Sequence, residues 1–345
     1  MIHVLIADDS AVAREFLAHI IDRQPDMQVV GAVANGAQAV AAVKNLRPHI
    51  VVMDSNMPVL DGFRATRQIM EEAPTPIVIV TASLRPEEVT TTFKAVEAGA
   101  LAVLAKPVGL GHPSFGQVTD TFVQTIRLMS EVKVVRRRNV GSRPGSASVR
   151  QEKTIRQVQG GIVAIGASTG GPQVIQTILN HLEPSLAAPV LIVQHISPGF
   201  VQGFVDWLAK TTRFPVKLAV AQEKLLAGQA YIAPDGCHLG VHNSGHLLLS
   251  EAPPENGLRP AVSFLFRSAA EAYGRKAVGV LLSGMGRDGA AELKLLREKG
   301  AVTIAQDEAS AVIFGMPGEA VRLGAACHVV PPEDIARIIN TTIFS

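Results

Sequence analysis

The chain has 345 residues, a net charge of +2 and a hydrophobic content of 47%, with only 4% aromatic residues. This length exceeds what one hydrophobic core usually organises, so we expect two domains. The near-neutral charge gives no global field to attract nucleic acid or a membrane surface. No apolar run approaches the roughly 20 residues that span a bilayer, and the N-terminus lacks the features of a signal peptide. We therefore expect a soluble, cytoplasmic protein without nucleic-acid binding or membrane insertion.

Cysteine usage excludes two further classes. The chain has two cysteines, Cys237 and Cys327, which lie far apart and have no CxxC or histidine-rich neighbour. This argues against a disulfide-stapled fold and against a zinc site.

The first 128 residues alternate short apolar runs with amphipathic segments, five times over. The expected strands are 2–7, 28–34, 49–54, 76–81 and 101–105, each followed by a helical pattern. The apolar runs at 50–53 and 77–80 are typical of central strands in parallel sheets. Alternation at this spacing predicts a flavodoxin-like, doubly wound domain with a five-stranded parallel sheet over 1–128.

Residues 129–158 break this alternation. The stretch 131–158 has eight Lys and Arg residues against two Glu, a local charge of +6, and it includes a segment rich in Gly, Ser and Pro at 141–146. We interpret this region as a basic, flexible linker.

The alternation returns in residues 159–345. We expect a strand to Gly166, a helix from Pro172, a β-rich middle region, and a final helix after Pro331-Pro332. The other expected elements are strands 189–194, 277–283 and 301–305 and helices 199–210, 261–273 and 288–299. This order predicts a second α/β domain with a mostly parallel sheet.

Polar side chains come at the ends of several strands of the first domain. Asp8 and Asp9 follow the first strand, Asp54 ends the third, Thr81 ends the fourth, and Lys106 follows the fifth. In a parallel sheet these ends share one edge, where ligands gather. Three carboxylates there need a hard cation, and Mg²⁺ suits oxygen ligands. Asp54 is then a candidate nucleophile toward a phosphoryl group, with Thr81 and Lys106 to hold its oxygens.

These residues stand in the motifs Ala7-Asp8-Asp9-Ser10, Asp54-x-x-Met57-Pro58-x-x-Asp61-Gly62, Thr81-Ala82 and Lys106-Pro107, which resemble the response-regulator receiver domain. The resemblance implies that Asp54 accepts phosphate from a histidine kinase. It also implies that Asp8, Asp9, Asp54 and the backbone of Asn56 bind Mg²⁺, and that the Lys106-Pro107 bond is cis. One departure is Val103, where the family often has an aromatic residue. Read alone, Asp8-Asp9 could instead cap the helix that begins near Ser10.

A serine turn opens the second domain. Gly166-Ala167-Ser168-Thr169-Gly170 matches G-x-S-x-G between an apolar strand and a helix that begins near Pro172, as in a nucleophile elbow. Small residues let the backbone turn sharply and present Ser168 at the helix N-terminus. Backbone N–H groups near Thr169 and at Met285 are candidate donors to a developing oxyanion.

A catalytic serine needs a base and an acid, which we expect at neighbouring strand ends. His195 ends the strand after the serine turn, and His238 is the main rival for the base. Asp288 follows another strand and is the candidate acid, although it could simply cap the helix over 290–299. The order Ser, His, Asp differs from that of the α/β-hydrolases.

The stretches around Ser168, Gln194-His195, residues 230–234, 284–290 and 305–310 resemble the catalytic domain of the bacterial chemotaxis protein-glutamate methylesterases. The resemblance implies hydrolysis of glutamate methyl esters on methyl-accepting chemoreceptors, with release of methanol, and deamidation of receptor glutamines. It makes the chain a response regulator of a two-component system, with a chemotaxis sensor histidine kinase as phosphodonor. Mg²⁺ serves the receiver, and the esterase site requires no cofactor. We expect a monomer in which the unphosphorylated receiver covers the Ser168 edge.

Two alternatives remain at this stage. The glycine-rich turn could cradle phosphate in a receiver-controlled nucleotide-binding domain, although it lacks the Lys-Ser/Thr of a P-loop. The output could also be another serine hydrolase. A transcription regulator is disfavoured because no helix-turn-helix pattern follows the basic stretch Arg136-Arg137-Arg138.

Overall fold

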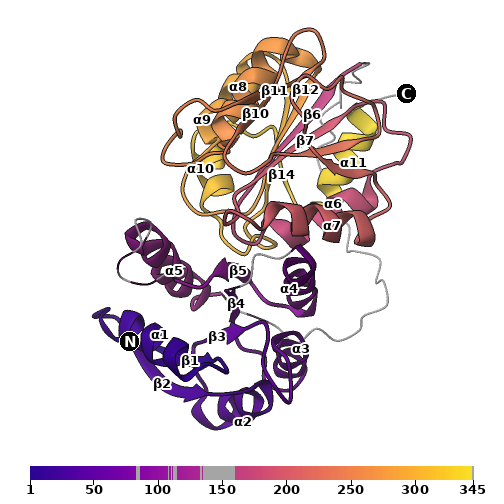
Figure 1. Cartoon of the computed structure of the whole chain (residues 1–345). Coiled ribbons are helices and arrows are strands. Elements are labelled where there is room, and N and C mark those ends of the chain that lie inside the picture. Colours follow the sequence, from indigo (N-terminus) through magenta and orange to yellow (C-terminus); the bar gives the residue numbers. More distant parts are fainter. Residues whose placement is uncertain are drawn as a thin grey trace. The chain divides into compact units, whose positions relative to one another are not determined.

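The computed structural model describes residues 1–82, 86–107, 109, 111, 115–132, 134 and 160–343. The chain divides into two compact units, Met1–Val149 and Arg150–Ser345 (Figure 1). Most of the predicted linker at 129–158 lies outside the described residues, and its boundaries stay a prediction. Of the helices in the described part of the chain, none is both long and apolar enough to cross a bilayer.

The first unit is built on a five-stranded sheet in the order β2-β1-β3-β4-β5, with every pairing parallel. Its strands are β1 (Ile2–Ala7), β2 (Met27–Val33), β3 (Ile50–Asp54), β4 (Ile77–Thr81) and β5 (Ala102–Ala105). All residues of β3 and β4 are buried, which explains why these strands are continuous apolar runs. The predicted doubly wound, parallel fold is confirmed.

Five helices connect these strands. They are α1 (Ala11–Asp22), α2 (Gly36–Leu46), α3 (Gly62–Glu72), α4 (Pro86–Ala98) and α5 (Phe115–Met129). Helix α1 contacts α5, whereas α2, α3 and α4 contact one another in series, so the helices form two layers. Side-chain caps mark three of their starts, because Ser10, Asn35 and Asp61 each accept a backbone N–H of the first turn.

The second unit contains a seven-stranded sheet in the order β14-β13-β12-β6-β7-β9-β8, again parallel throughout. Its strands are β6 (Ile162–Ala167), β7 (Val190–Gln194), β8 (Val216–Leu218), β9 (Ala230–Ile232), β12 (Ala277–Leu281), β13 (Val302–Gln306) and β14 (His328–Val330). A separate antiparallel pair is formed by β10 (His238–Val241) and β11 (Leu247–Ser250). This confirms a mostly parallel α/β domain.

Helices cover this sheet in two groups. They are α6 (Gly171–His181), α7 (Val201–Thr211), α8 (Val262–Ala272), α9 (Ala290–Glu298), α10 (Met316–Arg322) and α11 (Pro332–Thr342), with a 3₁₀ turn at Gly274–Lys276. Helix α6 contacts α7 and α11, whereas α9 contacts α8 and α10. The sequence pattern predicts neither α10 nor β14. Pro317 and Gly318 obscure the helix, and β14 is too short for an apolar pattern to stand out.

Candidate functional sites

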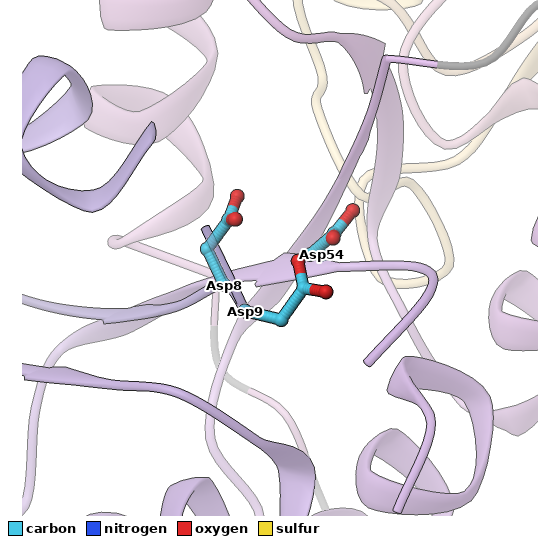
Figure 2. Close-up of side chains that lie close together, drawn as sticks. All are labelled: Asp8, Asp9 and Asp54. Atoms are coloured by element: carbon cyan, nitrogen blue, oxygen red, sulfur yellow. The ribbon is translucent and has the colours of Figure 1, made fainter. Parts of the chain in front are cut away.

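The predicted acidic cluster forms at one edge of the first sheet. Asp8 and Asp9 directly follow β1, and Asp54 is the last residue of the adjacent strand β3. One carboxylate oxygen from each of the three lies within 4.8 Å of the others (Figure 2). Asp8 and Asp54 are buried and Asp9 is exposed. This set of hard oxygen donors fits Mg²⁺, because three neighbouring carboxylates repel one another without a cation.

Lys106 already places one positive charge in this cluster. Its Nζ lies 2.7 Å from Asp8 Oδ2 and 3.2 Å from Asp54 Oδ2. Burial raises the pKa of Asp54 to about 6, Lys106 opposes the rise, and Asp8 adds to it. Burial would lower the pKa of Lys106, but Asp8 and Asp54 outweigh that effect and keep the pKa above its usual value. The protonation state of Asp54 therefore depends on the charges that enter this edge.

The remaining predicted receiver residues lie at the same edge. Thr81 is buried at the end of β4, and its carbonyl accepts the backbone N–H of Lys106 at 2.9 Å. Asn56 is exposed, two residues past the end of β3. Ser10 caps α1, while Asp8 accepts the Ser10 N–H, so one of the two aspartates also supports this turn. The expected cis bond at Lys106-Pro107 is wrong, since within the described ranges the cis peptide bond is Arg259-Pro260.

Ser168 lies at a sharp turn between β6 and α6. Its N–H donates to the Ser283 carbonyl at 3.0 Å, and its own carbonyl accepts the Gly171 N–H at 2.9 Å. Gly170 occupies the N-cap of α6 with φ 81°, a conformation that glycine adopts without strain. The half-buried Ser168 therefore stands where the free N–H groups of a helix begin.

His195 is the histidine that lies beside this turn. Its N–H donates to the Ala167 carbonyl at 2.9 Å, which extends the pairing of β6 and β7 up to Ser168. Its ring Nε2 lies 3.0 Å from Asp288 Oδ2, which leaves Nδ1 as the free ring nitrogen. Ser168 Oγ has no hydrogen-bond partner within the part of the chain described. Catalytic hydrogen bonds are often long before substrate binds.

Asp288 is held at the start of α8. The carboxylate accepts the Val262 N–H at 2.6 Å, the Ser263 N–H at 3.1 Å and the Ser263 hydroxyl. Burial would raise the pKa of Asp288, but the hydrogen bonds from His195, Ser263 and Val262 outweigh it and hold the pKa below its usual value. Asp288 does not cap the helix that follows it, because Gly289 is the N-cap of α9 without a side-chain bond.

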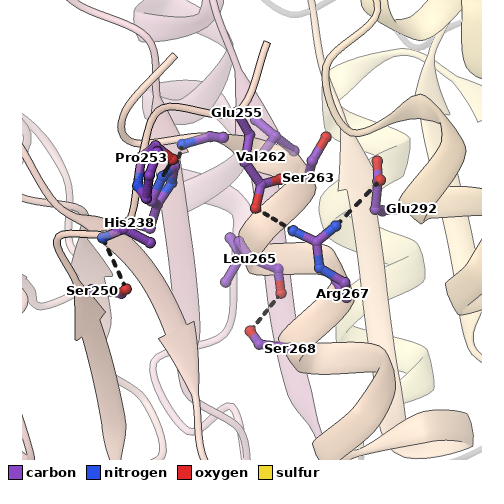
Figure 3. Close-up of polar contacts among 12 residues, drawn as sticks. His238, Ser250, Pro253, Glu255, Val262, Ser263, Leu265, Arg267, Ser268 and Glu292 are labelled. Atoms are coloured by element: carbon purple, nitrogen blue, oxygen red, sulfur yellow. Dashed lines mark hydrogen bonds and ion pairs between the residues drawn. The ribbon is translucent and has the colours of Figure 1, made fainter. Parts of the chain in front are cut away.

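The alternative base, His238, has no free ring nitrogen. The Ala261 N–H donates to His238 Nδ1 at 3.2 Å, so Nε2 carries the proton and donates to the Pro253 carbonyl at 3.1 Å. The ring is buried and stacks on Phe264 with centroids 4.8 Å apart. Figure 3 shows His238 on β10, beside Pro253 and close to the start of α8. Its contacts are those of a structural residue.

Two candidate oxyanion donors follow strands β6 and β12. The backbone N–H groups of Thr169 and Met285 donate no hydrogen bond within the described ranges. The segment around Met285 packs tightly against the serine turn, since a Cβ on Gly284 would lie 2.6 Å from Ser168 Cβ. Both N–H groups are thus available beside the site.

Two serines that support the site, Ser263 and Ser283, do not stand out in the sequence. Ser263 Oγ donates to Asp288 and accepts the Gly289 N–H. Ser283 Oγ donates to the Thr169 carbonyl at 2.7 Å and accepts the Ile313 N–H at 3.0 Å. In the sequence, each of these serines is only a polar residue next to an apolar run, and this pattern is too common to indicate a role.

Two family models match the chain. One, described as CheB methylesterase, matches residues 163–339, and the other, described as response regulator receiver domain, matches residues 4–112. These regions contain Ser168, His195 and Asp288 in the first case, and Asp8, Asp54 and Lys106 in the second.

Similar proteins cover the whole chain. A protein-glutamate methylesterase/protein-glutamine glutaminase of Nitrosospira multiformis is 49% identical over 99% of this chain and 97% of its own. One from Geobacter metallireducens is 50% identical over 99% of both chains. The crystal structure of the Thermotoga maritima CheB methylesterase catalytic domain is 38% identical, with a TM-score of 0.51, and covers 52% of this chain and 97% of that one.

Proposed function

Because the chain belongs to the CheB methylesterase family and has a response-regulator receiver domain, we propose that Ser168, His195 and Asp288 perform its hydrolysis under control of Asp54. The chain is a protein-glutamate methylesterase/protein-glutamine glutaminase of chemotaxis. Its substrates are glutamate methyl esters and glutamines of methyl-accepting chemoreceptors in the cytoplasm. The family match favours this output over the nucleotide-binding and other serine-hydrolase alternatives.

The observation that carries the catalytic assignment is the hydrogen bond between His195 and Asp288 beside the serine turn. With Nε2 bound to Asp288, His195 Nδ1 takes the proton as Ser168 Oγ attacks the ester carbonyl. Asp288 stabilises the resulting imidazolium, which then protonates the departing methoxide oxygen, so that methanol leaves. Water hydrolyses the acyl-enzyme by the same route, and a glutamine releases ammonia instead.

The developing oxyanion needs donors that are already in place. The N–H groups of Thr169 and Met285 serve this role, each worth about 10²–10³ in rate. Within the described part of the chain, neither N–H donates a hydrogen bond to another group, so both can donate to the oxyanion directly. The esterase chemistry uses no metal.

In the receiver, Asp54 accepts the phosphoryl group of a chemotaxis sensor histidine kinase. Asp8, Asp9, Asp54 and the Asn56 carbonyl would hold Mg²⁺, whose charge offsets that of the phosphoryl oxygens when it is bound. Thr81 and Lys106 bind the remaining oxygens. The short distance between Lys106 and Asp54 supports this role. The phosphorylated receiver relieves inhibition of the esterase, and the protein acts as a monomer.

The test is methanol release from methylated chemoreceptor membranes. Ser168→Ala is expected to lose release, whereas Ser185→Ala, which changes an exposed serine in the same domain, keeps it. A small-molecule phosphodonor with Mg²⁺ is expected to stimulate the wild type and to leave Asp54→Asn at its basal rate. Undiminished release by Ser168→Ala would remove the nucleophile and the mechanism with it.

A further inference from the structure

Gln194 is the last residue of β7 and directly precedes His195. Its side chain is buried, with 4% of the residue exposed. Its Nε2 donates one hydrogen bond to the Ser168 carbonyl and another to the His195 carbonyl, both at 2.8 Å. One amide group therefore contacts the backbones of two residues that directly follow β6 and β7, and both belong to the proposed catalytic set.

The orientation of this amide is determined by its neighbours. Both short contacts are to carbonyl oxygens, which accept hydrogen bonds, so the group that faces them must be the NH₂. The opposite orientation would place Oε1 against two acceptors. In the observed orientation Oε1 is buried without a hydrogen-bond partner among the described residues. A buried acceptor without a partner is unfavourable, but the two hydrogen bonds from Nε2 offset this cost and keep the amide in the observed orientation.

The serine turn leaves room for this amide. A Cβ on Gly171 would lie 2.2 Å from Gln194 Oε1 and 2.7 Å from Ala167 Cβ, so a side chain here would displace the amide or the end of β6. Glycine at the first position of α6 therefore lets the amide lie against the turn. The position of the amide thus depends on two residues, Gln194 at the end of β7 and Gly171 at the start of α6.

We propose that Gln194 is a positioning residue that sets the distance between the nucleophile Ser168 and the base His195. Ser168 Oγ and the His195 ring share no hydrogen bond in the described structure, so their backbones determine how they face each other. The β6–β7 register ends at Ala167 and Gln194, and the last backbone hydrogen bond between the two segments runs from the His195 N–H to the Ala167 carbonyl. Beyond that bond, the Gln194 amide connects the Ser168 carbonyl with the His195 carbonyl. This inference rests on the proposed roles of Ser168 and His195.

The experiment compares Gln194→Met, Gln194→Glu and a matched control in the full chain by methanol release. Methionine has a similar volume and no donor, so kcat is expected to fall about 10- to 100-fold, since a misplacement of about 1 Å can cost about 10²-fold. KM is expected to stay within about twofold, because Gln194 is buried behind the two residues. Gln229→Glu is the control, since the Gln229 amide also bridges two carbonyls, of Pro215 and Ala230, at the far strands of the sheet.

Gln194→Glu adds a second measurement, the pH dependence of kcat, which a purely structural role of Gln194 would not change. An ionised carboxylate has no donor for the two carbonyls, whereas the protonated acid can donate to one of them. The ratio of mutant to wild-type kcat is therefore expected to rise as the pH falls, while the ratio for Gln194→Met stays flat. Taking the ratio at each pH removes the titration of His195 itself.

Wild-type kcat in Gln194→Met, or a flat ratio in Gln194→Glu, would overturn the proposal. A loss that appears only in KM, or an equal loss in Gln229→Glu, would overturn it too. Ser168→Ala distinguishes this failure from that of the proposed function. If Ser168→Ala is inactive while Gln194→Met is unaffected, only the positioning role is wrong, whereas an active Ser168→Ala would refute the catalytic assignment first.

Discussion

Asp288 Oδ2 accepts a hydrogen bond from His195 Nε2 at 3.0 Å, and the same oxygen accepts the Val262 N–H at 2.6 Å. The proposed catalytic acid is thus bound to the first turn of α8, a helix that begins 26 residues earlier in the chain. A helix N-terminus stabilises a negative charge, which favours an ionised Asp288 beside the imidazolium that forms during turnover. The fold determines both the position and the charge of this group.

Replacing Asp288 by asparagine is expected to lower kcat for methanol release by at least about 10²-fold. The amide keeps the shape of the side chain but carries no charge, and its NH₂ group cannot accept hydrogen bonds from both His195 and α8. Asp206→Asn is the control, since Asp206 is a carboxylate on α7 that accepts from Gln202. Wild-type turnover in Asp288→Asn would show that the carboxylate has no part in the reaction.

His238 offers a test of which histidine is the base. His238→Ala leaves the Ala261 N–H and the Pro253 carbonyl without their partner and removes the stacking on Phe264. We expect the free energy of unfolding to fall by about 1–3 kcal/mol, while kcat per folded enzyme stays within about tenfold. His195→Ala is expected to show the reverse, a stable fold with loss of turnover. Urea unfolding together with methanol release measures both, and an inactive but stable His238→Ala would reopen the assignment.

Much of this arrangement could be predicted from the sequence because strand ends carry the chemistry. Apolar runs located β1, β3, β4, β6 and β7 to within a residue or two, and the polar residues that follow them meet at the edges expected for parallel sheets. What escaped prediction depends on contacts between distant segments. The anchoring of Asp288 on α8 and the ring contacts of His238 arise only when β10, α8 and β12 pack together, and no local pattern encodes this.

The raised pKa of Asp54 predicts how receiver stability depends on pH in Mg²⁺-free buffer. Its pKa is about 6 in the fold and near 3.8 in the unfolded chain, so folding disfavours the ionised form. The group is neutral in both states below about pH 4, so the wild type loses stability relative to Asp54→Asn as the pH rises from about 4 through 6 and is then constant. The shift corresponds to at most about 3 kcal/mol, and solvent screening reduces this to roughly 1–2 kcal/mol.

Thermal unfolding of both proteins from pH 4 to 7.5, with EDTA, tests this dependence. Asp120→Asn, which changes an exposed aspartate on α5, is the control and is expected to follow the wild type. Adding Mg²⁺ at pH 7.5 should stabilise the wild type more than Asp54→Asn, because the cation binds ionised carboxylates. A constant difference between the two proteins across this range would contradict the raised pKa.

Deleting residues 1–130 tests the proposed inhibition by the receiver. The second compact unit contains Ser168, His195 and Asp288 together with all of their described partners, so the truncated protein is expected to keep its site. If the receiver inhibits, basal methanol release rises on deletion and no longer responds to a phosphodonor. A hundredfold rise would mean that the receiver favours the inactive state by about 2.7 kcal/mol, and phosphorylation of Asp54 must then offset that amount. Unchanged or lower turnover in a folded truncated protein would show that the receiver does not inhibit the esterase, because an inhibitor cannot be removed without a gain.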